Sequence, residues 1–164
     1  DEELAALRRL IDLEKIREVV TLYSQLMDGR EWERMAELYT EDAECEWGPY
    51  GTWHGRVAIQ RALVDGHPGR LPFDGLHVTT NLQIDVTGPD TAVSRNYLTD
   101  VWQKREGDAD GPITHPGWPA NPVILYAIYD NDYRKDAGVW RIARSQIQFL
   151  WPERVTREDF PRKL

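Results

Sequence analysis

The spacing of apolar residues changes near residue 72, and this change constrains the fold more than any other feature of the chain. Before it, apolar residues recur at helical spacing. They predict a long amphipathic helix from Leu4 to Asp28, a shorter one over 32–39 and a third over 55–63, with a short strand and a turn between the last two. We expect Gly29 to end the first helix in the left-handed conformation that glycine tolerates best.

The remainder of the chain has the composition of a sheet. Four segments rich in β-branched and aromatic residues follow one another, at 76–86, 91–103, 123–133 and 139–151. Helices followed by a run of strands predict a single α+β domain over 1–164, in which a curved antiparallel meander wraps around the helices. The connection at 104–122 is longer than a hairpin requires, so we expect it to be a lid or an insertion loop.

The amino-acid composition limits the classes of binding partner that we expect. The 164 residues include 20 Lys+Arg and 28 Asp+Glu, for a formal net charge of −8. This acidic balance argues against nucleic acid and against anionic membrane surfaces, and it favours a small hydrophobic molecule as the partner. The sequence contains no apolar run of the length that spans a membrane, about 18 residues, and no signal segment, so a cytoplasmic location is expected.

Metal and cofactor motifs are missing from the sequence. Cys45 is the only cysteine, and none of the four histidines has a second histidine or cysteine at metal-ligand spacing. The chain also lacks a phosphate-binding glycine loop and a dinucleotide fingerprint. We therefore expect no metal and no cofactor, and chemistry carried by side-chain acids and bases.

Two residues stand out as a candidate acid–base pair. His77 lies at the start of a predicted strand and would be a natural general base near neutral pH, although an exposed or merely hydrogen-bonded histidine fits the mixed strand pattern equally well. Asp28 lies at the C-terminal end of a helix, where the helix dipole disfavours a carboxylate. It either forms a capping box with Glu31 or orients the imidazole of His77, as the carboxylate of a catalytic triad does.

Three further polar residues are weaker candidates. The phenol of Tyr23 could donate a hydrogen bond to a developing oxyanion, although a core tyrosine is the commoner case. Asp100 falls in mid-strand between apolar neighbours, which places it either on a solvated face or in a pocket. Arg144 has the same strand phase as Trp140 and Ile142 and could face a substrate anion, unless it is a solvated strand arginine.

Several segments, in their order and spacing, resemble the SnoaL-like branch of the nuclear-transport-factor-two-like superfamily over nearly the whole chain. They are 13–17, 39–43, 55–59, 77–81, 85–92 and 138–143. The resemblance implies a cone-shaped α+β barrel, with a long N-terminal helix and two shorter helices on a curved, mostly antiparallel sheet that encloses an apolar pocket. It also implies a homo-oligomer, with a trimer favoured over a dimer.

Within that superfamily the chain is most similar to the cofactor-free dehydratase and lyase group, which includes scytalone dehydratase and the bile-acid 7-alpha-dehydratase. This similarity implies catalytic roles for Asp28 and His77, and less strongly for Tyr23 and Asp100. The expected function is a lyase, most simply a dehydratase. A lyase that releases formaldehyde from an aromatic diol, an isomerase or polyketide cyclase, and a non-catalytic binding module are the alternatives.

The substrate is expected to be hydrophobic and aromatic or polycyclic, because the chain is rich in Trp and Tyr. The candidate substrate-binding residues are Trp47, Tyr50, Trp53, Trp102, Trp118, Tyr126, Arg144 and Phe149.

Overall fold

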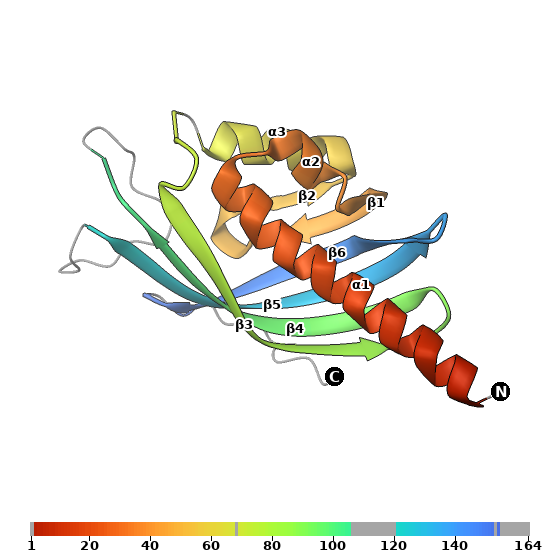
Figure 1. Ribbon diagram of the computed structural model, residues 1–164. Helices are drawn as coiled ribbons and strands as arrows, with labels where there is room; N and C mark the ends of the chain where they lie inside the picture. The colour runs from red at the N-terminus through yellow and green to blue at the C-terminus, as the bar shows by residue number, and fades with distance from the viewer. Residues whose placement is uncertain (1, 68, 106–120, 153, 155–164) are drawn as a thin grey trace.

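The computed structural model describes residues 2–67, 69–105, 121–152 and 154. In this part of the chain, three helices pack on a curved sheet of six strands (Figure 1). The helices are α1 (Glu2–Gly29), α2 (Trp32–Ala36) and α3 (Arg56–Gly66), with a 3₁₀ turn, η1, at Gly48–Tyr50. The strands are β1 (Tyr39–Glu46), β2 (Thr52–His54), β3 (Gly75–Val86), β4 (Thr91–Trp102), β5 (Val123–Asp136) and β6 (Val139–Trp151).

The sheet has the strand order β2-β1-β6-β5-β4-β3 and is not closed. Strands β3 to β6 form the predicted antiparallel meander. Strand β1 pairs in parallel with β6 and antiparallel with β2, which makes the sheet mixed. Helix α1 crosses one face of the sheet, while α2 and α3 lie over the end formed by β1 and β2 (Figure 1). This is the expected cone-shaped α+β fold.

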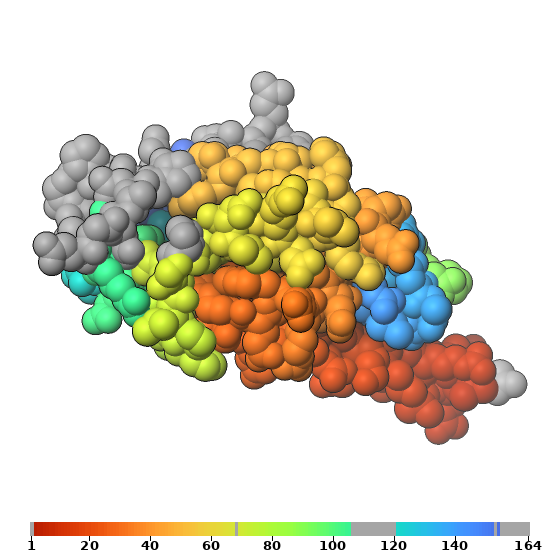
Figure 2. All heavy atoms as spheres, turned by 90° about the horizontal axis from the view of Figure 1, so that it is seen from above, coloured from red at the N-terminus to blue at the C-terminus, as the bar shows by residue number. Residues whose placement is uncertain are grey.

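Only the C-terminal part of α1 is buried. Its core face begins at Ile16 and includes Tyr23, whereas the apolar residues of the first turns are more than two-fifths exposed: Leu4, Leu7, Leu10 and Ile11. These first turns project beyond the sheet in both views (Figures 1 and 2). No helix of the described residues is both long enough and apolar enough to span a membrane.

The prediction for the residue that ends α1 was wrong. Arg30, with φ of 59°, takes the left-handed position instead of Gly29. The amide nitrogens of Arg30 and Glu31 donate to the carbonyls of Met27 and Leu26, at 3.2 and 2.9 Å, which is the Schellman pattern of a helix end.

The predicted second helix is also shorter than expected. Helix α2 ends at Ala36, and Tyr39 begins β1 instead of ending the helix. Tyr39 is fully buried and is registered with Ile142 on β6. Strand pairing therefore overrides the helical spacing that Tyr39 shares with the preceding residues.

Two of the bulges in the described strands change the faces on which candidate site residues lie. In β3 an extra residue lies between Thr80 and Gln83, and Asn81 there has φ of 52°. Side chains at odd positions such as His77 face inward before the bulge, and those at even positions such as Ile84 do so after it. In β6, Arg144 and Ile142 pair with consecutive residues of β5, so Ala143 is the extra residue.

Of the predicted insertion 104–122, residues 106–120 lie outside the described part of the chain, and so does Trp118. The residues that flank this segment are joined. The side chain of Asn121 exchanges two hydrogen bonds with the backbone of Lys104, at 3.1 and 3.2 Å.

Candidate active site

Asp28 and His77 meet where the end of α1 lies beside β3, the last strand in the order of the sheet. The Nδ1 atom of His77 is 2.7 Å from Oδ1 of Asp28. The backbone nitrogen of His77 also donates to both carboxylate oxygens, at 3.0 and 3.1 Å. Helix α2 has no side-chain cap, so Asp28 does not form the capping box. Its carboxylate instead binds the histidine through both backbone and ring.

This geometry defines the tautomer of His77. A carboxylate can only accept, so Nδ1 carries the proton that Asp28 binds. In the neutral imidazole, Nε2 is then the free basic nitrogen. The side chains of both residues are only 13% and 10% exposed, and His77 lines a cavity. The pair therefore has the arrangement of a general base held by a buried carboxylate.

Asp100 lies directly opposite His77 on β4, and its Oδ1 atom is 3.9 Å from Nδ1 of His77. It lines the same cavity. Burial raises the pKa of Asp100, and the negative charge of Asp28 raises it further. The positive charge of His77 lowers this pKa, but the net shift is upward. Burial alone would lower the pKa of His77, but Asp100 and Asp28 together raise it above the ordinary value of 6.5.

The cavity has a volume of about 270 Å³ and lies between the helices and the sheet. Its aromatic lining comes from η1 and the residue before it, from β2 and from the strands of the meander, and consists of Trp47, Tyr50, Trp53, Trp102, Tyr129 and Phe149. The rings contact one another in pairs, with centroids 5.3 Å apart for Trp47 and Trp53 and 5.6 Å apart for Tyr50 and Phe149. Such walls suit a flat apolar molecule.

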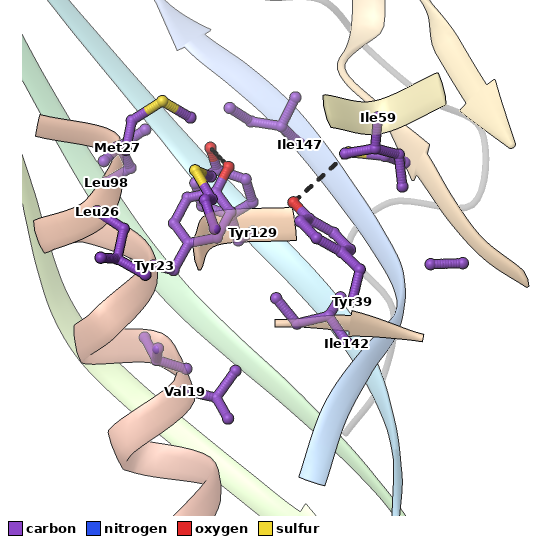
Figure 3. Close-up of a cluster of buried hydrophobic side chains, with 14 of the residues drawn as sticks. Val19, Tyr23, Leu26, Met27, Tyr39, Ile59, Leu98, Tyr129, Ile142 and Ile147 are labelled. Carbon is purple, nitrogen blue, oxygen red and sulfur yellow. Dashed lines mark hydrogen bonds between the residues drawn. The ribbon is translucent and has the colours of Figure 1, made fainter. Parts of the chain in front are cut away.

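Tyr23 does not line this cavity; Tyr129 does. The two hydroxyl oxygens are 3.2 Å apart, and the rings pack edge to face in the buried cluster (Figure 3). Burial raises the pKa of both phenols well above 10, so both remain protonated donors. Tyr129 is therefore the phenol that faces the cavity, and Tyr23 contacts its hydroxyl from the core side.

Two candidate substrate-binding residues lie outside the cavity lining. Tyr126 is 45% exposed on the outer face of the sheet, because its neighbour Leu125 faces inward and side chains alternate along a strand. Arg144 does not share the face of Ile142, because the bulge at Ala143 reverses the alternation. Its Nε atom lies 3.5 Å from a carboxylate oxygen of Glu44.

Three cavity residues with nitrogen-bearing polar side chains were, like Tyr129, not among the sequence candidates: Arg30, His67 and Arg70. The Nδ1 atom of His67 is 2.8 Å from the carbonyl oxygen of Leu63, so it carries the proton and leaves Nε2 as an acceptor. Burial lowers the pKa of His67 to about 4, which keeps the ring neutral. The sequence signal for His67 and Arg70 is weak, since both lie in a loop rich in Pro and Gly.

No group of three or more His, Cys, Asp or Glu side chains within the described ranges is arranged to hold a metal ion. The chemistry available from these residues is proton transfer by His77 and Asp100, together with hydrogen bonding by Tyr129.

A family model for the SnoaL-like domain matches residues 8–146. The chain belongs to the SnoaL-like family. No curated protein matches this SnoaL-like chain.

Solved structures share the fold of this SnoaL-like protein. An NTF2-like protein with a cystatin-like fold from Novosphingobium aromaticivorans is 25% identical, with a TM-score of 0.72 over 92% of this chain and 89% of that one. A protein from the same organism named for scytalone dehydratase is 23% identical, with a TM-score of 0.71 over 88% of each chain. A LinA-type hexachlorocyclohexane dehydrochlorinase from Novosphingobium barchaimii is 19% identical, with a TM-score of 0.69 over 93% of this chain and 99% of that one.

Proposed function

We propose that this SnoaL-like protein is a cofactor-independent lyase, most simply a dehydratase, that acts on a hydrophobic aromatic or polycyclic substrate bearing a hydroxyl group. The observation that carries the proposal is the 2.7 Å contact between Asp28 and His77 at the wall of an aromatic cavity. Two proteins of similar fold are named for a dehydratase and a dehydrochlorinase, which supports elimination as the class of reaction.

The elimination uses the cavity groups in named roles. Nε2 of His77 takes a proton from the carbon next to a carbonyl, and the electron pair of that C–H bond forms the new double bond as the C–O bond breaks. The departing hydroxyl leaves as water after it receives that proton from Nε2 of His77, and the ionised carboxylate of Asp100 stabilises the imidazolium until then. Asp28 stabilises the imidazolium formed on His77, and Tyr129 donates a hydrogen bond to the carbonyl oxygen as negative charge develops there.

The proposal is tested by incubating the protein, with a chelator present, against aromatic and steroidal β-hydroxy carbonyls and aromatic diols. Product masses are read beside those of the His77→Ala variant. Loss of water in the wild type alone supports the dehydratase. Loss of formaldehyde assigns the aromatic-diol lyase, and an unchanged mass assigns an isomerase or cyclase. If compounds bind but none is turned over, the protein is a non-catalytic binding module.

Tyr129→Phe is expected to lower kcat by about 100- to 1,000-fold, because one hydrogen bond to the oxyanion is lost. Tyr23→Phe should have a smaller effect, since its hydroxyl reaches the cavity only through Tyr129. Steady-state kinetics of both variants provide the measurement. Equal losses in the two variants would contradict a direct role for Tyr129.

His77 must be neutral to act as a base, and its pKa is raised above 6.5. The value of kcat/KM should therefore decrease as the pH is lowered through this raised pKa. Asp100→Asn removes a negative charge that raises this pKa, so the acidic limb of the profile of kcat/KM against pH should move to lower pH. Asp90→Asn, at an exposed turn residue, is the control that should leave the limb in place. A limb that moves equally in both variants would refute the assignment.

The outer face of the sheet carries a row of apolar side chains that we propose is covered by further copies of this chain in a trimer. The exposed residues are Leu76, Val78, Tyr97, Tyr126 and Trp151, which come from four adjacent strands. Light scattering should give three times the chain mass of 19.0 kDa. Val78→Glu should shift that mass toward the monomer, and a monomeric wild type would rule the trimer out.

A further inference from the structure

Arg30 occupies a backbone conformation that favours glycine, at a position that borders the cavity. Its φ is 59°, at the point of the Schellman motif where glycine is most common. A left-handed arginine costs free energy that glycine would not, and strain of this kind clusters at functional sites. The preceding residue is Gly29, so the chain places an arginine at the strained position although a glycine is one residue away.

The side chain of Arg30 lies over the ring of Trp32 and forms part of the cavity wall. The guanidinium carbon lies 5.5 Å from the centroid of the indole ring, and Nη1 donates to the carbonyl oxygen of Met27 at 3.4 Å. The Nε atom of Arg30 is buried and has no hydrogen-bond partner. Among the described side chains that line this cavity, one other has such an atom, the indole Nε1 of Trp47. Both atoms are donors, so both need an acceptor.

A second guanidinium borders the same cavity. Arg70 lies with its guanidinium carbon 4.3 Å from the ring centroid of Trp102, and its Nη1 donates to the carbonyl oxygen of Gln103 at 2.7 Å. Burial lowers the pKa of Arg30 and the charge of Arg70 lowers it further, while the carboxylates of Asp100, Asp28 and Asp74 oppose this. The like charges of these two guanidinium groups, which border one cavity, repel each other, and an anion bound between them would relieve that repulsion.

We propose that Arg30, with Arg70 beside it, forms the anion-binding end of the cavity, and that the substrate is an aromatic or polycyclic compound that carries a carboxylate. Guanidinium groups bind carboxylates through paired, charge-assisted hydrogen bonds, and Arg30 and Arg70 both line this cavity. Neutral His67, whose ring is stacked 5.1 Å from Trp32, adds no charge that would compete. The proposal rests on the proposed lyase for the reacting end of the substrate, but binding of the carboxylate requires no turnover.

The test is calorimetric titration at pH 8 with two probes of the same shape, 2-naphthoate and neutral 2-naphthamide. We expect the wild type to bind the carboxylate about 10-fold more tightly than the amide or better, as a charge-assisted hydrogen bond implies. Arg30→Gly should abolish this preference without lowering the melting temperature, because glycine relieves the left-handed strain. Arg34→Gln, at an exposed arginine on α2, is the matched control and should keep the preference.

Three results would overturn the proposal: equal affinity of the wild type for both probes, a preference that survives in Arg30→Gly, or a preference that disappears only in His77→Gln. The last result would place the anion on the imidazolium of His77. Failure of the lyase proposal gives a different pattern, in which the carboxylate is preferred and the preference depends on Arg30, but no compound is turned over.

Discussion

The His77→Gln variant is expected to lose about 10³-fold in kcat/KM on the substrate identified by product mass, because a positioned general base contributes rate factors of about 10² to 10⁴. Glutamine keeps the backbone donor to Asp28 and a side chain of similar reach, but it cannot take a proton. The loss should therefore appear in kcat, with substrate affinity changed much less. Steady-state kinetics and direct ligand titration measure the two quantities separately.

His54→Gln is the control for this experiment. His54 has a side chain that is 72% exposed and does not line the cavity, so its variant should retain wild-type kinetics. An unchanged circular dichroism spectrum and melting temperature would show that His77→Gln is folded. A folded His77→Gln variant with wild-type turnover would end the proposal that His77 is the base.

Asp28→Asn is expected to cost about 10⁴-fold in kcat, as the same change of a triad carboxylate does. The amide NH₂ of asparagine can donate to Nδ1 of His77, which moves the imidazole proton to Nε2 and blocks the basic nitrogen. The amide oxygen can still accept from the backbone nitrogen of His77, so the fold should persist. Kinetics together with urea unfolding distinguish this loss from destabilisation.

Asp65→Asn provides a closely matched control. Asp65 is the second-to-last residue of α3, as Asp28 is of α1, and each precedes a glycine, but Asp65 is exposed. It should therefore show the general effect of removing a carboxylate from a helix end and nothing more. Similar kinetics in the two variants would mean that the charge of Asp28 acts on the helix and not on His77.

The order of the elements follows from local patterns. The long helix, the third helix and the four strands of the meander were predicted close to their observed bounds, because each pattern spans enough residues to be unambiguous. The prediction was wrong at the left-handed residue after α1 and over 37–39, where the second helix was extended too far. There α2 has five residues and pairing with β6 brings Tyr39 into the sheet, an effect that no local pattern contains.

The candidate pair of Asp28 and His77 was proposed from residue type, position and family resemblance, and in the structure the two side chains are in contact. The alternation around His77 is mixed because the β3 bulge reverses it at Asn81. The other bulge, at Ala143, explains why the phase of Arg144 was misread. A bulge depends on the pairing of two strands, so a period of two read from one strand cannot reveal it.

The sequence by itself determined which elements form and which residues carry titratable chemistry, because helix and strand periods and side-chain pKa values are local properties. Only the tertiary structure decided which groups share the cavity. It placed Tyr129 instead of Tyr23 at the wall, and it brought Arg30 and Arg70 beside the same space. Such neighbours come from elements far apart in the chain, and their contacts arise from packing of the helices on a bulged and curved sheet.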